Sequence, residues 1–187
     1  MIFEKNKLLL LKTGLLSALF ILLYVWLLPL YDVSDLSKGL YSLDVRSSYT
    51  KAIVIQLFNS IEEPGIVQYR KFLLVDFAYI FIYGFLSFHI LKLLLNHMGR
   101  LADMLEFTIW TPFILMILDI IENINTLFLL NNTTEIANNA VQFGSVVTSV
   151  KWIAASVVLG IIICYAFYAV LRYVFWKLRN HESTLSK

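Results

Sequence analysis

The pattern of apolar and polar positions divides the chain into four long apolar stretches separated by polar segments. The stretches cover about residues 13–30, 72–95, 102–130 and 146–176. A helix needs about 20 consecutive apolar residues to cross the hydrocarbon core of a bilayer. The pattern therefore predicts four membrane-spanning helices, and the short turns between the later ones indicate that neighbouring helices run antiparallel.

The first stretch follows a short basic lead, an arrangement that cleaved signal peptides share with retained first helices. Its apolar region is longer than a typical signal core, and the residues that end it, VWLLPLYD, contain no small-x-small cleavage motif. Tyr24, Trp26 and Tyr31 lie near its end, where aromatic residues are typical of the membrane–water interface. We therefore expect a retained first helix.

The longest polar segment, residues 31–71, joins the first two stretches. Between Thr50 and Ile61 the apolar residues recur at helical spacing, which predicts an amphipathic helix with Ser47 or Ser48 as its N-cap. These apolar residues are Ile53, Leu57, Phe58 and Ile61. The sequence Glu-Glu-Pro-Gly at 62–65 should end the helix. We expect it to lie on the membrane or across the mouth of the bundle.

The third stretch contains a proline, and the segment after it carries no basic residue. Pro112 predicts a kink because proline has no backbone N–H. The carbonyl group that loses its donor needs another one, and the hydroxyl group of Thr108 or Thr111 is suited to this role. Residues 131–144 are predicted to form a polar loop before the fourth stretch.

The composition agrees with a membrane protein. Hydrophobic residues make up 59% of the chain and the mean hydropathy is +0.76, above the usual apolar share of soluble domains. The formal net charge of +2 is small, and no basic patch is interleaved with aromatic residues, so nucleic acid is not an expected partner. Membrane lipids are therefore the expected surroundings.

The basic residues indicate the orientation of the chain in a cell or plasma membrane. Seven of them fall on the side of the two termini: Lys5, Lys7, Lys12, Lys92, Arg100, Lys177 and Arg179. The 131–144 loop on the other side has none, and the basic residues of segment 31–71 are accompanied by acidic ones. The positive-inside rule then predicts that both termini are cytoplasmic.

Motifs for metal, cofactor or nucleophilic chemistry are absent from the sequence. The single cysteine, Cys164, excludes an internal disulfide and a CxxC site. The three histidines form no HExxH pair, and the chain contains no P-loop, GxGxxG or GxSxG motif. We expect neither a metal ion nor a bound cofactor.

Ionisable residues interrupt the apolar stretches and are the best indication of a functional site. In the third stretch, Asp119, Glu122 and Asn123 lie within two helical turns of one another. Asp76 lies in the second stretch and Lys151 in the fourth. Ionisable groups at such depth are costly and usually face a partner or a water-filled cavity. At 1.5 Å per residue, the four charged groups come within about two turns of one another in height, in the outer half of the membrane.

The helical faces agree with one shared site. The predicted site residues are Asp76, Tyr79, Tyr83, Asp119, Glu122, Asn123 and Lys151. Three carboxyl groups face one ammonium group, so we expect at least one carboxyl group to hold its proton near neutral pH. The alternative is plain hydrogen bonding between helices, each link worth about 1 kcal/mol or less. We favour that alternative for Tyr79, Tyr83, Asn125 and Thr126, and a functional role for Asp119, Glu122 and Lys151.

Three runs, SYTKAIVIQLFNSIEEPGIVQYRKFLLVDFAYIFIYG, LDIIEN and TSVKW, resemble a mainly bacterial family of four-helix integral membrane proteins without an assigned activity. In that family an Asp followed by a Tyr, a D-x-x-E-N motif and a Lys lie in successive spans. The resemblance covers about residues 49–152, and it points to Tyr69, Asp76, Tyr83, Asp119, Glu122, Asn123 and Lys151. Where the family has Gly-Arg before the first Tyr, this chain has Gly65 and Ile66, so the resemblance implies no arginine there. The resemblance supports the predicted site, with Tyr69 in place of Tyr79, and implies no chemistry.

We predict a single all-α domain over residues 1–187, an integral membrane four-helix antiparallel bundle with an extracytoplasmic amphipathic helix between spans 1 and 2. The leading hypothesis is a site open to the outer side that binds or transports a small polar or lipid-like ligand, with a link to protons. A transporter of this size would need to oligomerise, so this hypothesis includes a homo-oligomer.

Two other hypotheses stay open. The first is a membrane-embedded enzyme that acts on a lipid or polyisoprenoid head group, with a carboxylate as general base and Lys151 stabilising negative charge. The scarcity of arginines or of a metal-binding acid pair near the surface weakens this hypothesis. The second is a structural or assembly subunit.

Overall fold

The computed structural model describes residues 2–33, 36–37 and 40–185, with side chains from Lys7 to Leu178, and these residues are helical wherever they are regular. The helices are α1 (Ile2–Leu22), α2 (Lys51–Leu95), α3 (Leu101–Leu105), α4 (Thr111–Asn131) and α5 (Asn138–Leu185), with short segments η1 (Leu23–Leu27), η2 (Leu43–Val45) and η3 (Glu106–Trp110). No strand occurs in this part of the chain, so the all-α prediction is confirmed. Residues 34–35 and 38–39 of the predicted 31–71 segment lie outside the described residues.

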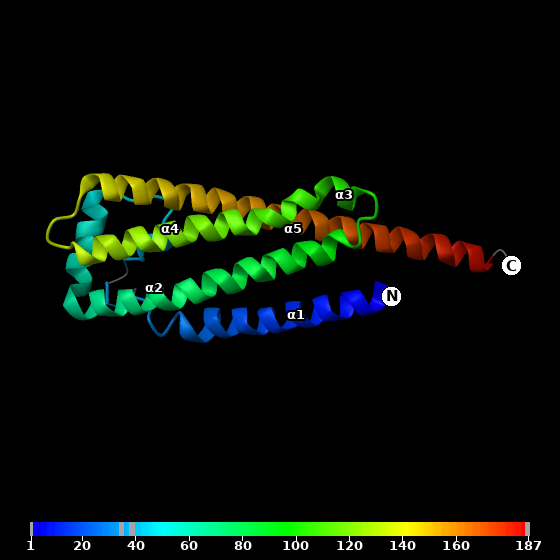
Figure 1. The fold of residues 1–187 in the computed structure, drawn as a ribbon, viewed down its shortest axis with the longest axis horizontal. Coiled ribbons are helices and arrows are strands. Elements are labelled where there is room, and N and C mark those ends of the chain that lie inside the picture. Colours follow the sequence, from blue (N-terminus) through cyan, green and yellow to red (C-terminus); the bar gives the residue numbers. More distant parts are fainter. Residues whose placement is uncertain (1, 34–35, 38–39, 186–187) are drawn as a thin grey trace.

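The long helices lie side by side along one axis, with the ends of α1 and α5 that carry the termini at the same end of the molecule (Figure 1). Contacts join α5 to α4, α4 to α2 and α2 to α1, and α2 also contacts α5. Consecutive long helices therefore run in opposite directions, and α4 lies between α2 and α5. The C-terminal part of α5 extends past the other helices (Figure 1).

Among the described residues, four helical stretches are long and apolar enough to cross a membrane. They cover Lys7–Leu27, Lys51–Leu95, Leu101–Asn131 and Asn138–Leu178. The shortest has 21 residues and a length of about 31 Å at 1.5 Å per residue. Only 6% of the most apolar window of the first helix and 11% of that of the fourth are buried, so these helices turn most of their apolar side chains outward. Soluble monomers rarely expose apolar surface on that scale.

The predicted amphipathic helix is present as the first part of α2, Lys51–Ile61, and lies across the end of the bundle opposite the termini (Figure 1). Its apolar face is buried, through Val54, Leu57, Phe58 and Ile61. The N-cap is Thr50, whose hydroxyl oxygen accepts a hydrogen bond from the Ile53 N–H, so Ser47 and Ser48 were wrong as caps. The predicted break is confirmed at Glu62, where φ is 54° and ψ is −172°.

Pro112 lies in the first turn of α4, where a proline is tolerated because the first N–H groups of a helix have no partner inside it. The short 3₁₀ segment η3 ends directly before α4. The carbonyl oxygen of Thr108, four residues before the proline, accepts a hydrogen bond of 2.8 Å from the Thr111 hydroxyl. This is one of the two substitute donors that the sequence predicts.

Helix α5 begins at Asn138, inside the segment predicted as a loop, so residues 132–137 alone connect α4 to α5. The Val141 N–H bonds to the Ala137 carbonyl at 3.2 Å, and the Val141 side chain is buried in the apolar core. Asparagines are weak helix formers, but the burial of Val141 outweighs that preference. The polar composition of the segment therefore gave the wrong boundary.

The apolar core has two parts, one at each end of the bundle. The part near the Lys51–Ile61 helix includes Leu57, Tyr69, Leu73 and Leu129, and the part near the termini includes Leu91, Met98, Ile109 and Tyr165. On α2, Asp76 and Tyr83 come between Leu73 and Leu91, so the polar side chains lie between the two apolar parts.

Candidate functional site

A buried ion-pair cluster joins α4 to α5. The Lys151 Nζ atom lies 3.3 Å from Asp119 Oδ1 and donates a hydrogen bond to Glu122 Oε2. Glu122 is 0% exposed and Lys151 is 8% exposed. Because Asp119 and Glu122 are three residues apart, they lie on the same face of α4. One ammonium group is therefore shared by two carboxylates in the interior.

The same acids are linked to α2 and to a further side chain of α5. Tyr83 donates a hydrogen bond of 2.8 Å to Asp119 Oδ2, so Asp119 binds α2 through one oxygen and Lys151 through the other. One turn away, Asn123 Nδ2 donates to Asp76 Oδ2 at 2.8 Å. Thr148 donates to Glu122 Oε1. We call these residues the polar cluster: Asp76, Tyr83, Asp119, Glu122, Asn123, Thr148 and Lys151.

Six of the seven predicted site residues are thus brought together, and Tyr79 lies at the edge of the polar cluster. Its ring stacks on Phe20 and Tyr24 of the first helical segment, with centroids 5.3 and 6.2 Å apart, and lies 5.4 Å from the Tyr83 ring. These ring contacts pack α1 and η1 against α2. Thr148 is the additional side chain in the cluster.

The segment before α2 covers the polar cluster. In addition to its two contacts with carboxylates, Lys151 Nζ donates a hydrogen bond of 3.1 Å to the backbone carbonyl of Asp44 in η2. Next to it, the Leu43 N–H donates to the Tyr69 hydroxyl at 2.8 Å, and the Leu43 side chain is 0% exposed. The sequence predicts a site open to the outer side, and in this structure η2 lies against Lys151, whose side chain is 10% exposed. Movement of η2 would increase access to Lys151.

Further hydrogen bonds hold this covering segment, residues 40–50, against α5. The Ser149 hydroxyl donates to the Ser47 carbonyl at 2.7 Å, and Trp152 Nε1 donates to the Arg46 carbonyl at 3.0 Å. Most of these bonds use backbone carbonyl groups, which every residue has. No side-chain pattern in the sequence could therefore have predicted them.

The Asp44 carboxyl group lies in an environment that disfavours its charged form. Its Oδ1 atom is buried and has no hydrogen-bond partner among the described residues. Burial raises the pKa of the Asp44 carboxyl group above its ordinary value of 3.8, and the opposing attraction of Lys151 and the hydrogen bond from Ser42 are smaller effects. The covering segment therefore contains a group whose charged form is disfavoured in the closed structure.

Close packing around Gly144 joins the end of the covering segment, at Tyr49, to α5. A Cβ atom at Gly144 would lie 2.2 Å from Asn125 Nδ2 and 2.3 Å from the Tyr49 hydroxyl oxygen. Burial raises the pKa of Tyr49 to about 12, so its hydroxyl group stays protonated at physiological pH. The Tyr49 N–H donates to the Ser145 hydroxyl at 2.9 Å. Only glycine allows α5 to approach these two side chains so closely.

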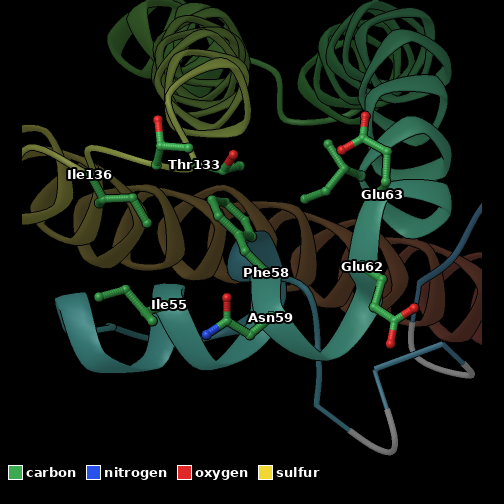
Figure 2. A pocket seen from close by; sticks show the side chains of 9 residues that line it. Ile55, Phe58, Asn59, Glu62, Glu63, Thr133 and Ile136 are labelled. Atoms are coloured by element: carbon green, nitrogen blue, oxygen red, sulfur yellow. The ribbon is translucent and has the colours of Figure 1, made fainter.

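A separate cleft of about 540 Å³ lies at the bend of α2, beside the loop between α4 and α5 (Figure 2). It is lined by Ile55, Phe58, Asn59, Glu62, Glu63, Ile66, Thr133, Thr134 and Ile136, none of which belongs to the polar cluster. Figure 2 shows Glu62 and Glu63 pointing to opposite sides, so their carboxylates do not converge on one ligand atom. Among the described side chains of residues 7–33, 36–37 and 40–178, no three of His, Cys, Asp or Glu are grouped so that they could hold a metal ion.

The chemistry available in the polar cluster is proton and charge exchange. It places a tyrosine hydroxyl, two carboxyl groups and one ammonium group within one chain of hydrogen bonds and ion pairs, with the Asp76–Asn123 pair one turn away, and the single ammonium group compensates only part of the negative charge. The chain matches no family model and no curated protein, its fold matches no solved structure, and the resemblance to a bacterial four-helix family therefore stays a prediction.

Proposed function

We propose that the protein is an integral membrane protein whose four long helices cross the bilayer, with both termini in the cytoplasm. The outward apolar side chains of the first and last helices support this, because lipid would cover them. Lys7, Lys92, Arg100 and Lys177 belong to the end of the bundle at which the termini lie, in keeping with the positive-inside rule. The Lys51–Ile61 helix then lies on the outer side.

We further propose that the polar cluster binds or transports a small polar or lipid-like ligand and that this process is linked to protons. The observation that carries the proposal is that one ammonium group, on Lys151, is shared by Asp119, Glu122 and the Asp44 carbonyl. Two carboxylates and one ammonium leave an excess negative charge, and Asp76 adds a third acid nearby. An uncompensated charge in this environment is costly, so a proton or a cationic group must balance it.

Lys151 links the state of the acids to the covering segment. When a proton or a ligand cation binds the carboxylates, Lys151 loses part of the attraction that holds it against α4, so it can move away together with η2 while it keeps its hydrogen bond to the Asp44 carbonyl. Opening of η2 would then expose the cluster to the outer side. In this scheme Asp119 and Glu122 hold the proton or ligand, Tyr83 and Thr148 orient the acids, and Lys151 couples binding to access.

The test is a pair of double variants expressed in a strain that lacks the gene. Lys151→Met with Glu122→Gln removes one charge of each sign from the polar cluster, and Lys177→Met with Glu135→Gln removes the same charges from exposed positions. We expect the control pair to restore the wild-type phenotype and the cluster pair to fail while still reaching the membrane. Native mass spectrometry of gently extracted protein should show a co-purified molecule on wild type and control alone.

A contrary result would assign the polar cluster a structural role. If the cluster pair is folded, restores the phenotype and retains the same co-purified molecule, the charges serve only to hold the helices together. Carbonate washing of the membranes tests the location separately, because an integral protein stays in the membrane pellet.

A further inference from the structure

Two clefts meet on the C-terminal half of α5, at the end of the bundle that holds the termini. The first has a volume of about 270 Å³ and is lined by Asn96, His97, Ala169, Arg172, Tyr173 and Trp176. The second, of about 440 Å³, is lined by Tyr168, Leu171, Arg172, Phe175 and Trp176. Arg172 and Trp176 line both, so a polar cleft and an apolar cleft lie on either side of the same two residues.

The turn between α2 and α3 positions the Arg172 guanidinium group. One of its N–H groups donates to the His97 carbonyl. Gly99 has φ of 64°, a conformation that favours glycine, and a Cβ atom there would lie 3.0 Å from Arg172 Nη1. Arginine has five N–H donors, and one of them is used among the residues that the structure describes. The other four have no partner among those residues and can bind an anion in the first cleft.

The charge at this end favours an anion. His97 and Arg172 line the polar cleft, and Lys92, Arg100 and Lys177 lie on the adjoining parts of α2, the turn and α5. The acids of this end among the described side chains are Asp103 and Glu106, on α3 and η3. The aromatic side chains Tyr173 and Trp176, with ring centroids 6.2 Å apart, are of the types that gather at the membrane–water interface.

We propose that these two clefts bind an anionic phospholipid of the cytoplasmic leaflet. Arg172 and the 96–100 turn hold the phosphate group, since a guanidinium group offers paired N–H donors to phosphate oxygens. One acyl chain lies in the second cleft, against Phe175 and Trp176. Basic pockets between helices on the cytoplasmic side are known to suit anionic head groups. This inference rests on the membrane location proposed above, and it is independent of the polar cluster.

The test measures bound lipid on the purified full-length protein by native mass spectrometry, with phosphatidylglycerol or phosphatidylcholine added to the detergent. Arg172→Gln should lower phosphatidylglycerol binding about tenfold, the effect of losing charge-assisted hydrogen bonds to phosphate. Lys177→Gln removes the same charge from the next turn and lines neither cleft, so binding should change less than twofold. Trp176→Ala should also weaken binding severalfold. Trp176 is exposed, so this replacement should leave the fold intact.

Four outcomes overturn the lipid-binding proposal. Equal loss in Arg172→Gln and Lys177→Gln would mean that a diffuse positive charge attracts the lipid. Unchanged binding in Trp176→Ala, or equal binding of the two lipids, would exclude a site built from both clefts. Inorganic phosphate that displaces the lipid completely at millimolar concentration would show that the acyl chain is not held. A protein that leaves the membrane on carbonate washing would refute the membrane location itself, which distinguishes that failure from the others.

Discussion

Replacing Lys151 with methionine should destabilise the protein strongly, because it removes the single ammonium group that two buried carboxylates share. Glu122 would keep the hydrogen bond from Thr148 alone, and the Asp44 carbonyl would lose its donor. Breaking a buried ion pair by removing one partner typically costs about 3–5 kcal/mol. For a chain of this size, 1 kcal/mol corresponds to a shift in Tm of about 2–4 °C, so we expect Tm to fall by about 10 °C.

A second substitution should return part of this loss. Glu122→Gln in the Lys151→Met background removes the uncompensated charge and keeps an acceptor for Thr148. Residues in contact within one ion-pair network typically show coupling of about 0.5–3 kcal/mol, so the double variant should be more stable than the sum of the single losses predicts. Thermal unfolding in one detergent at pH 7, followed by tryptophan fluorescence, measures all four proteins of the cycle.

Lys177→Met is the matched control, since it removes a lysine from an exposed position of the same helix. Surface substitutions of this kind usually change stability by less than about 0.5 kcal/mol. The reasoning is refuted if Lys151→Met unfolds at the temperature of the control. It is equally refuted if the losses of the two single variants simply add, because the two side chains then do not interact.

Three other predictions concern the backbone and the covering segment. Glu62→Gly should raise Tm, because a positive φ with an extended ψ costs a non-glycine residue about 1–3 kcal/mol, whereas Glu63→Gly in helical backbone should lower it. Gly144→Ala should cost about 1–3 kcal/mol through overpacking, while Gly160→Ala, with no atom within 4 Å of the added carbon, should be neutral or stabilising. Asp44→Asn should be more stable than wild type at pH 7. The raised pKa of Asp44 favours folding only while the carboxyl group is protonated, so this gain should vanish below pH 3.8, and Tm measured against pH checks it.

The polar cluster could be predicted because its geometry follows from local rules. The spacing of Asp119 and Glu122 places both on one face of a helix, and counting residues from the ends of the apolar stretches gives the depth of Lys151. Antiparallel neighbours then bring these groups together without any knowledge of the loops. The same counting cannot give the rotation of a helix that is apolar on every side, which is why Tyr79 could be placed near the site but not assigned to the contact with α1.

The position of the covering segment could not be predicted, because backbone groups carry its contacts. Residues 40–50 have the polar composition of a solvent-exposed loop, yet Leu43 is buried and its N–H donates a hydrogen bond to the Tyr69 hydroxyl. Sequence composition shows how polar the side chains are, but it does not predict which backbone carbonyl groups face inward. The consequence for function is specific: the Asp44 carbonyl competes with Asp119 and Glu122 for the same ammonium group, so any ligand that changes the charge of the acids also changes the strength of the cover.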